Sequence, residues 1–200
     1  MTFDHKWIYS TIGILCAVFM SCGSGHSPIS HFIGTTVGFP KELTIETIGE
    51  STQEPPDTTA AVKIVVYTRS EGCDDCSLKV LSQWKRRMAE MDSLSPATAF
   101  VFIFAPARWE KLYSGLQVHR FTAPVFYDSC GAFERSNPGL PTNPVFHTFL
   151  LDKDNRVVLV GSPIGNPKMW NLYKSTIARL AAHGGTLPDE QNEKSDPDRN

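Results

Sequence analysis

Two cysteines three positions apart, Cys73 and Cys76, constrain this chain more than any other feature of its sequence. They follow an apolar run rich in β-branched residues, residues 62–67, and they precede a segment with apolar residues at helical spacing. The run predicts a strand buried on both faces, and the segment predicts a core-facing helix. A helix N-terminus stabilises a thiolate on the first cysteine of such a pair. The order strand, C-x-x-C and helix therefore indicates a redox site with Cys73 and Cys76 as its catalytic pair.

The first 21 residues have the pattern of a secretion signal. Lys6 is followed by an apolar stretch that is too short to span a membrane comfortably as a mature helix. Ser21, a small residue, then precedes Cys22, an arrangement similar to the site at which bacterial lipoproteins are cleaved and acylated. We expect residues 1–21 to be a lipoprotein signal peptide, Cys22 to carry the lipid and residues 22–31 to form a tether. Simple cleavage and a retained anchor are the alternatives.

The one cysteine left after the expected signal peptide, the lipid-bearing Cys22 and the C-x-x-C pair are set aside, together with the overall charge, narrows the range of possible functions. Cys130 follows a stretch that predicts a turn, and it is either a resolving thiol or, as we favour, a small turn residue. A formal net charge of -2 gives no basic stripe, so nucleic-acid binding has no electrostatic support. A single C-x-x-C lacks the second ligand pair of a structural zinc site, and we expect no metal and no other cofactor.

The rest of the chain predicts one domain, residues 32–185, in which strands and helices alternate. Short apolar runs broken by glycines in residues 32–49 predict an N-terminal hairpin. After Gly184-Gly185 the chain is polar and charged, so residues 186–200 are expected to be a disordered tail. Strands are expected at residues 62–68, 99–104, 124–127, 147–151 and 156–161. Helices are expected after the cysteines, at residues 106–114 with Gly115 as the stop, and after the cap Asn166-Pro167.

Both long helices are expected to pack an apolar face against the core. For the first helix that face holds Leu78, Leu81, Trp84, Met88 and Met91, and for the last helix it holds Trp170, Tyr173, Ile177, Leu180 and Ala181.

The element order resembles that of the thioredoxin-like fold. Residues 65–76 are similar to the strand and active-site loop of thioredoxins and glutaredoxins. Residues 124–128 and 148–158 are similar to the later part of redoxins tethered in the bacterial envelope. The resemblance implies an α/β fold in which helices flank a central mixed sheet.

A narrower resemblance is to thioredoxin-like lipoproteins of Bacteroidota. It is carried by Ser70-Glu71-Gly72-Cys73 and by residues 147–152 and 161–168, within a match over about residues 32–182. It implies a lipid-anchored protein of the cell envelope, on the periplasmic or outer-membrane face.

The resemblance also suggests three auxiliary site residues. Thioredoxins have a cis-proline opposite the active-site disulfide, and Phe146 aligns with it here, two residues after Pro144. Tyr67 stands where thioredoxins have a buried aspartate, which leaves Glu71 as the nearest candidate proton acceptor. His147 is a candidate for tuning Cys73 or for binding metal with the pair, although a structural role is the more common one for such a histidine.

Asp74 and Asp75 lie between the two cysteines, and their carboxylates oppose a thiolate on Cys73. A destabilised thiolate favours the disulfide, so the sequence predicts a reducing potential. We therefore expect a membrane-tethered thiol:disulfide oxidoreductase with a reductase or exchange role, in which Cys73 attacks and Cys76 resolves. Its expected partners are protein thiols or disulfides of the envelope and an electron donor in the membrane.

Two alternatives to this activity stay open. The first is a non-catalytic, thioredoxin-fold binding lipoprotein in which the disulfide is structural. The second is a peroxidase, which is less favoured because Val66 and Ser70 replace the proline and threonine of the peroxiredoxin motif.

Overall fold

A single mixed sheet forms the centre of the molecule. The computed structural model describes residues 28–48, 54–69, 80–95 and 97–188, which include the first residues of the predicted tail and the last of the predicted tether. The strand order is β1-β4-β3-β2-β5-β6. The pairs β2–β3 and β3–β4 are parallel, and the pairs β1–β4, β2–β5 and β5–β6 are antiparallel. The strands are β1 (Thr44–Glu46), β2 (Val62–Arg69), β3 (Thr98–Ala105), β4 (Val125–Tyr127), β5 (Thr148–Leu151) and β6 (Val157–Val160).

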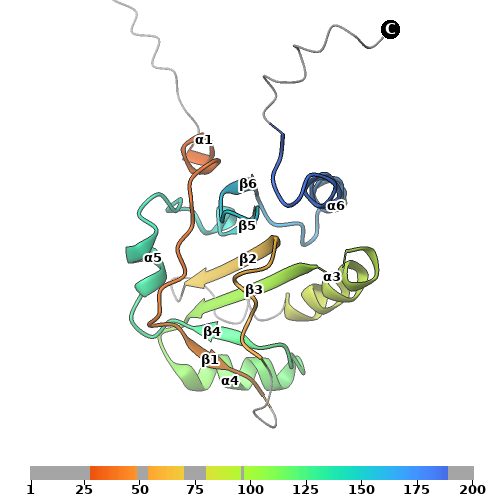
Figure 1. Cartoon of the computed structure of the whole chain (residues 1–200). Helices are drawn as coiled ribbons and strands as arrows, with labels where there is room; N and C mark the ends of the chain where they lie inside the picture. Colours follow the sequence, from red (N-terminus) through yellow and green to blue (C-terminus); the bar gives the residue numbers. More distant parts are fainter. Residues whose placement is uncertain (1–27, 49–53, 70–79, 96, 189–200) are drawn as a thin grey trace, which may run out of the picture.

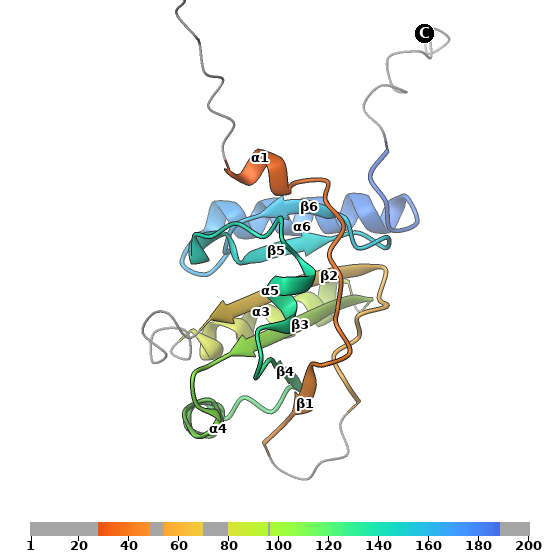
Figure 2. The same cartoon turned by 90° about the vertical axis from the view of Figure 1, so that its left-hand side faces the viewer.

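Helices lie on both faces of the sheet (Figures 1 and 2). They are α1 (Pro28–Phe32), α3 (Leu81–Leu94), α4 (Trp109–Val118), α5 (Ala132–Ser136), α6 (Pro167–Ala182) and the 3₁₀ helix η1 (Pro144–Phe146). Helices α3 and α6 cover one face, and α5 lies on the other (Figure 2). None of the helices in the described ranges is long and apolar enough to cross a membrane. The predicted mixed sheet flanked by helices is confirmed.

The face covered by α3 and α6 holds the larger apolar cluster. Trp84 of α3 packs edge-on against Phe102 of β3, with ring centroids 5.8 Å apart. Helix α6 starts as predicted, because the Asn166 side chain accepts a hydrogen bond from the Met169 N–H and Pro167 occupies the first turn. The predicted apolar faces are buried at Leu81, Trp84 and Met91 of α3 and at Trp170, Tyr173, Ile177 and Leu180 of α6.

Four details of the helices differ from the prediction. Met88 is only half-buried, and Ala181 is exposed at the end of α6. Helix α4 begins at Trp109 rather than Pro106 and continues through Gly115 to Val118. Gly115 therefore does not stop the helix, because the burial of Leu112 and Leu116 against the core outweighs the cost of a glycine inside a helix.

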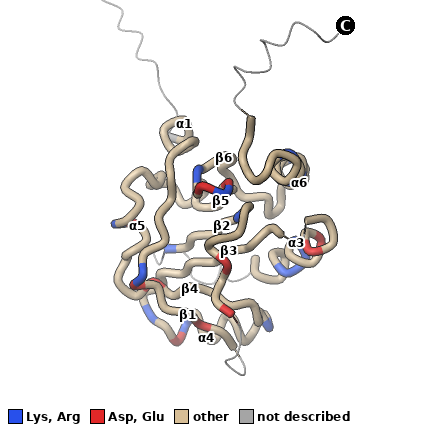
Figure 3. Tube along the Cα trace, viewed as in Figure 1, with Lys and Arg blue, Asp and Glu red and all other residues tan. Residues whose placement is uncertain are grey.

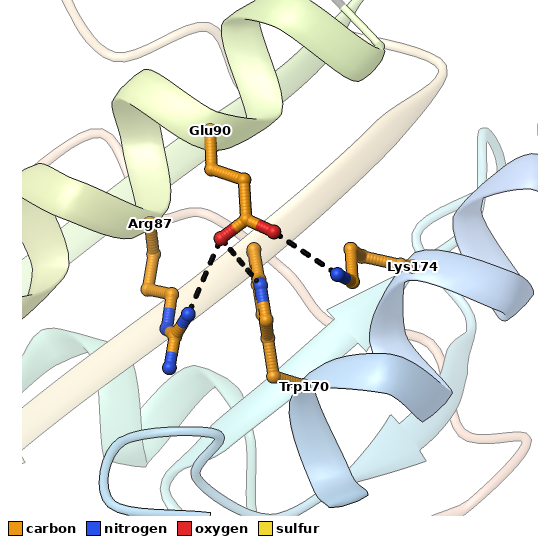
Figure 4. A network of polar contacts seen from close by, with 4 residues as sticks. All are labelled: Arg87, Glu90, Trp170 and Lys174. Carbon is orange, nitrogen blue, oxygen red and sulfur yellow. Dashed lines mark hydrogen bonds and ion pairs between the residues drawn. The ribbon is translucent and has the colours of Figure 1, made fainter. Parts of the chain in front are cut away.

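A polar network joins α3 to α6 at the protein surface (Figure 4). Glu90 of α3 accepts hydrogen bonds from Arg87 at 3.2 Å, from the Trp170 indole at 2.8 Å and from Lys174 at 3.0 Å. The Arg87 guanidinium also lies 5.0 Å from the centre of the Trp170 ring, which is a cation–π contact. Two side chains of each helix, Arg87 and Glu90 of α3 and Trp170 and Lys174 of α6, thus connect the two helices.

The predicted N-terminal hairpin is wrong. The two runs that were expected to pair with each other instead pair at opposite edges of the sheet. Thr36 bridges to Arg156 beside β6, where Gly34 N–H donates to Val157 O and Val157 N–H donates to Thr35 O. The second run forms β1, which pairs with β4 at the other edge. We call residues 33–43, which cross between these edges, the strap.

The strap covers the sheet face that carries α5 (Figure 2). Val37 and Leu43 of the strap are buried there beside Phe133 of α5. The Asn137 side chain, itself buried, accepts from Gly38 N–H at 2.8 Å and donates to Gly38 O at 3.0 Å and to Phe133 O at 2.8 Å. The side chain of Asn137, 99 positions away in sequence, thus makes the hydrogen bonds to the Gly38 backbone that a paired hairpin strand would have made.

Candidate functional site

The predicted redox segment connects the end of β2 to the start of α3. Cys73, Cys76 and Glu71 lie outside the described residues, as do residues 1–21 and Cys22. The structure describes the residues on either side of this segment, up to Arg69 at the end of β2 and from Val80 before α3. Because β2 and β3 are parallel, their carboxyl ends meet at one edge of the sheet, and this edge is the candidate site.

An apolar hollow of about 170 Å³ lies at this edge. It lies beside the end of β2, the first turn of α3, and the turn η1 that precedes β5. Its lining includes Thr68, Trp84, Phe104, Val145 and Thr148. Val145 is 64% exposed, so its side chain stands at the rim rather than in the core.

Phe146, the residue that aligns with the proline of thioredoxins, does not line this hollow. Its partly buried ring packs into the apolar cluster on the strap side of the sheet. The turn begins at Asn143, whose side chain accepts a hydrogen bond from Val145 N–H at 3.1 Å. Pro144 and Val145 are the turn residues that face the hollow. The peptide bonds of the described chain, those of this turn included, are trans.

His147 follows this turn and is buried, with 1% of its surface exposed. Its Nε2 is 2.7 Å from Pro141 O, and its ring centre is 5.2 Å from that of Tyr67. Burial is the main cause that lowers the pKa of His147 below its ordinary value of 6.5. Its Nδ1 has no hydrogen-bond partner among the residues that the structure describes. The part of the chain that the structure describes contains no group of three metal-ligating side chains, so His147 joins no such group there.

Tyr67 occupies the place of the thioredoxin aspartate and is also buried. Burial and the neighbouring Glu134 carboxylate, which hydrogen-bonds to its side chain, raise the pKa of Tyr67 far above its ordinary value. Glu134 in turn forms an ion pair with Arg69 at 3.0 Å. Glu134 was not predicted as a site residue, because it belongs to the short helix α5, which was not predicted either.

One local signal could have revealed α5. Asp128 follows β4 closely, and its carboxylate accepts hydrogen bonds from the N–H groups of Ala132 at 2.8 Å and Phe133 at 2.9 Å. An aspartate a few residues before an apolar pair is a typical start of a helical turn. Tyr67, Arg69, Asp128 and Glu134 also line a second, polar hollow of about 520 Å³ at the same edge of the sheet.

Cys130 lies in the turn between β4 and α5, where a turn was predicted; it is exposed, and within the described ranges it forms no disulfide. Its Sγ is 3.6 Å from Arg135 Nη2 and 3.9 Å from Asp128 Oδ1, and Arg135 Nη1 donates a hydrogen bond to the Cys130 carbonyl. The alternative role as a resolving thiol stays a prediction.

Acidic and basic side chains are interspersed along the described chain (Figure 3).

Comparison with solved structures identifies the fold. The thioredoxin domain of a thiol-disulfide oxidoreductase from Bacteroides vulgatus aligns with a TM-score of 0.50 at 10% identity, over 72% of this chain and 96% of that one. The fold is thioredoxin-like. This confirms the predicted fold class, and at this identity the likeness concerns the fold alone. No family model matches the sequence, and no curated protein matches it.

Two further solved structures are similar to this chain. A putative protein disulfide isomerase from Bacteroides thetaiotaomicron has a TM-score of 0.48 at 14% identity, over 64% of this chain and 80% of its own. A putative thiol:disulfide interchange protein from Chlorobium tepidum has a TM-score of 0.48 at 15% identity, over 71% of this chain and 96% of its own.

Proposed function

We propose that this protein is a thiol:disulfide oxidoreductase of the bacterial envelope, anchored by a lipid on Cys22 and using Cys73 and Cys76 as its dithiol. The observation that supports the proposal is that the C-x-x-C falls, in the sequence, between the end of β2 and the start of α3. The segment joins β2 to α3 at the edge where two parallel strands end, on a thioredoxin-like sheet. The Bacteroides vulgatus domain with this fold carries the name of such an oxidoreductase, which agrees with the proposal.

The exchange reaction needs only the two thiols and a disulfide substrate. The Cys73 thiolate attacks one sulfur of the substrate disulfide, which forms a mixed disulfide and releases the other substrate sulfur as a thiolate. The Cys76 thiolate then attacks the Cys73 sulfur, and the second substrate thiol leaves. The substrate disulfide gains two electrons and becomes two thiols, while the protein pair becomes a disulfide. An electron donor in the membrane would return the pair to the dithiol.

Asp74 and Asp75 set the direction that we propose for this exchange. Two carboxylates beside the sulfurs oppose the thiolate form and favour the disulfide, which makes the reduced pair a better electron donor. We therefore propose a reductase or exchange role toward protein disulfides of the envelope.

The test is the reduction potential of the Cys73/Cys76 couple. The protein is equilibrated with graded dithiol buffers, and free thiols are trapped and counted by mass spectrometry. We expect a reversible two-electron transition between about -270 and -180 mV. Replacing the exposed Cys130 by serine should leave the transition unchanged, and replacing Cys73 by serine should abolish it.

A non-catalytic binding protein is the competing function. The observation that favours it is the turn before β5, where Phe146 takes the place of the thioredoxin proline and packs into the core. A disulfide that resists reduction below about -300 mV, or that never forms between Cys73 and Cys76, would support the binding protein and contradict the oxidoreductase.

A further inference from the structure

Acidic and basic side chains alternate along most of the chain, but one end of the molecule has basic side chains alone. All 21 aspartates and glutamates lie outside residues 5–41 and 155–188. The described parts of these ranges include α1, the start of the strap, β6 and α6, which lie together at one end of the molecule (Figures 1 and 2). Residues 155–188 contain the basic residues Arg156, Lys168, Lys174 and Arg179. This end is therefore positive in a chain whose formal net charge is -2.

Helix α6 directs three exposed side chains away from the core. Lys168, Leu172 and Arg179 follow one another at spacings of four and seven residues, which places them on one face of the helix. All three are exposed, and Leu172 is exposed to 46%. The apolar residues that α6 buries against the sheet occupy the opposite face. The exposed face thus combines two cations with an apolar side chain between them.

This face of α6 is turned toward β6 and away from α3. On the flank toward α3, Lys174 pairs with Glu90 at 3.0 Å, and Asn171 and Ala178 line a groove shared with α3. On the other flank, the side chain of Met169 lies against Gly161, the residue directly after β6. Leu172 and Arg179 belong to this second flank by helical spacing, so they lie on the side of the sheet edge formed by β6.

Two further exposed side chains belong to the same sheet edge. Ile33, directly after α1, is 48% exposed, and Arg156, directly before β6, is also exposed. Their neighbours in the chain are joined, because Gly34 N–H donates a hydrogen bond to Val157 O at 2.7 Å. We call the set the edge face, and its members are Ile33, Arg156, Lys168, Leu172 and Arg179.

We propose that the edge face lies on an anionic phospholipid surface, with its three cations at the headgroups and its two apolar side chains between them. Charge complementarity favours this partner, since basic side chains beside a bilayer are attracted to anionic lipids and exposed apolar side chains enter the interface. The inference rests on the lipid proposed for Cys22. Cys22 lies six positions before Pro28, the first residue of α1, so the intervening chain spans at most about 20 Å. The anchor therefore holds this end of the molecule near the bilayer.

The second contact gives the anchored domain an orientation. A lipid alone leaves the domain free to turn, whereas a lipid combined with a basic surface holds a protein to the bilayer at two points. With β6 nearest the bilayer, the strands of the sheet run along it. The carboxyl ends of β2 and β3, where the candidate site lies, then open to the side, and partners reach the site without passing between the domain and the lipid.

Lysine labelling in vesicles tests the docking. The protein is purified from bacterial membranes, and its intact mass shows whether Cys22 carries a lipid. It is placed in vesicles of phosphatidylcholine alone, or of equal parts of phosphatidylcholine and phosphatidylglycerol, and is acetylated briefly with N-hydroxysuccinimidyl acetate. Mass spectrometry gives the labelling rate of Lys168 in the edge face and of the exposed Lys41, which lies beside β1 at the opposite sheet edge. We expect the ratio of the Lys168 rate to the Lys41 rate to be about fivefold lower in the anionic vesicles, and high salt to remove the difference.

Two charge reversals and a matched control locate the contact. Arg179→Glu and Arg156→Glu each reverse one charge of the edge face and keep Lys168 as the reporter. Both side chains are exposed, so neither change should impair folding, and either variant alone suffices for the test. We expect each to bring the Lys168 rate in anionic vesicles to within about twofold of that in neutral ones. Arg108→Glu changes the net charge equally at an exposed position before α4, at the other end of the molecule, and should keep Lys168 protected (Figure 1).

The outcomes separate the docking from the proposed function. Equal ratios of the Lys168 and Lys41 rates in the two kinds of vesicle would refute the docking and leave the lipid anchor and the oxidoreductase in place, as would equal effects of Arg179→Glu and Arg108→Glu. Slow labelling of Lys168 in neutral vesicles as well would mean that protein covers the face, either the net-negative segment 189–200 or a second copy, and would also refute it. An intact mass without a lipid on Cys22 would refute the proposed anchor and this inference with it.

Discussion

Replacing Asn137 by alanine should detach the strap from α5. The side chain makes three hydrogen bonds, two with the backbone of Gly38 and one with Phe133 O. At a net contribution of about 1 kcal/mol each, their loss would cost about 3 kcal/mol. Gly38 is exposed, so water can replace part of its two bonds, and we expect a loss of about 2 kcal/mol in the free energy of unfolding.

Urea unfolding followed by tryptophan fluorescence measures this loss, because Trp84 and Trp170 are buried in the larger cluster. Asn171→Ala is the matched control, since Asn171 is exposed on α6 and its loss should change stability by less than about 0.5 kcal/mol. If the strap leaves the folded protein altogether, the slope of unfolding free energy against urea should also fall, because less surface remains to be exposed. A loss below about 0.5 kcal/mol for Asn137→Ala would show that these bonds do not hold the strap.

Two further predictions concern the Glu90 network between α3 and α6 and the buried histidine. Glu90→Ala removes the common acceptor of the network in Figure 4 and should lower the free energy of unfolding, measured with urea, by about 1 to 2 kcal/mol, and by less at high salt. The control Glu42→Ala, at an exposed site, should leave the free energy of unfolding almost unchanged. Equal effects of the two changes would refute the network's role. Because burial lowers the pKa of His147, the unfolded chain binds a proton that the folded chain does not, so the melting temperature should fall as the pH drops below about 6.5 and the fall should level off below the folded pKa. His147→Gln should flatten this fall between pH 7.5 and pH 5, and a slope unchanged from that of the exposed control variant His183→Gln would contradict the assignment.

Local sequence patterns were sufficient to predict most strands of the sheet and both long helices. The continuous apolar run around residues 62–68 predicted a strand buried on both faces, and β2 is buried along nearly its whole length between two apolar clusters. Asn166 and Pro167 predicted the start of α6 because a cap and a preset φ act within one turn. Such signals need no knowledge of the rest of the fold.

The strap shows where local patterns fail. The apolar runs at its two ends have the alternation and glycines of a hairpin, but each pairs with a different edge of the sheet. Alternation predicts that a segment is a strand and leaves its partner open. The two sheet edges offer unpaired backbone groups, and Asn137 offers a third set of partners, so distant segments decide the pairing.

The same division holds at the candidate site. The sequence alone determined the thioredoxin-like order of elements and the place of Cys73 and Cys76 between a buried strand and a helix, because strand burial and helix periodicity are written in consecutive residues. Only the tertiary structure decided that Glu134 lies beside Tyr67 and that His147 is buried against Pro141 O. Burial and hydrogen-bond partners depend on which segments the folded chain brings together, and no local pattern around a single histidine or glutamate encodes them.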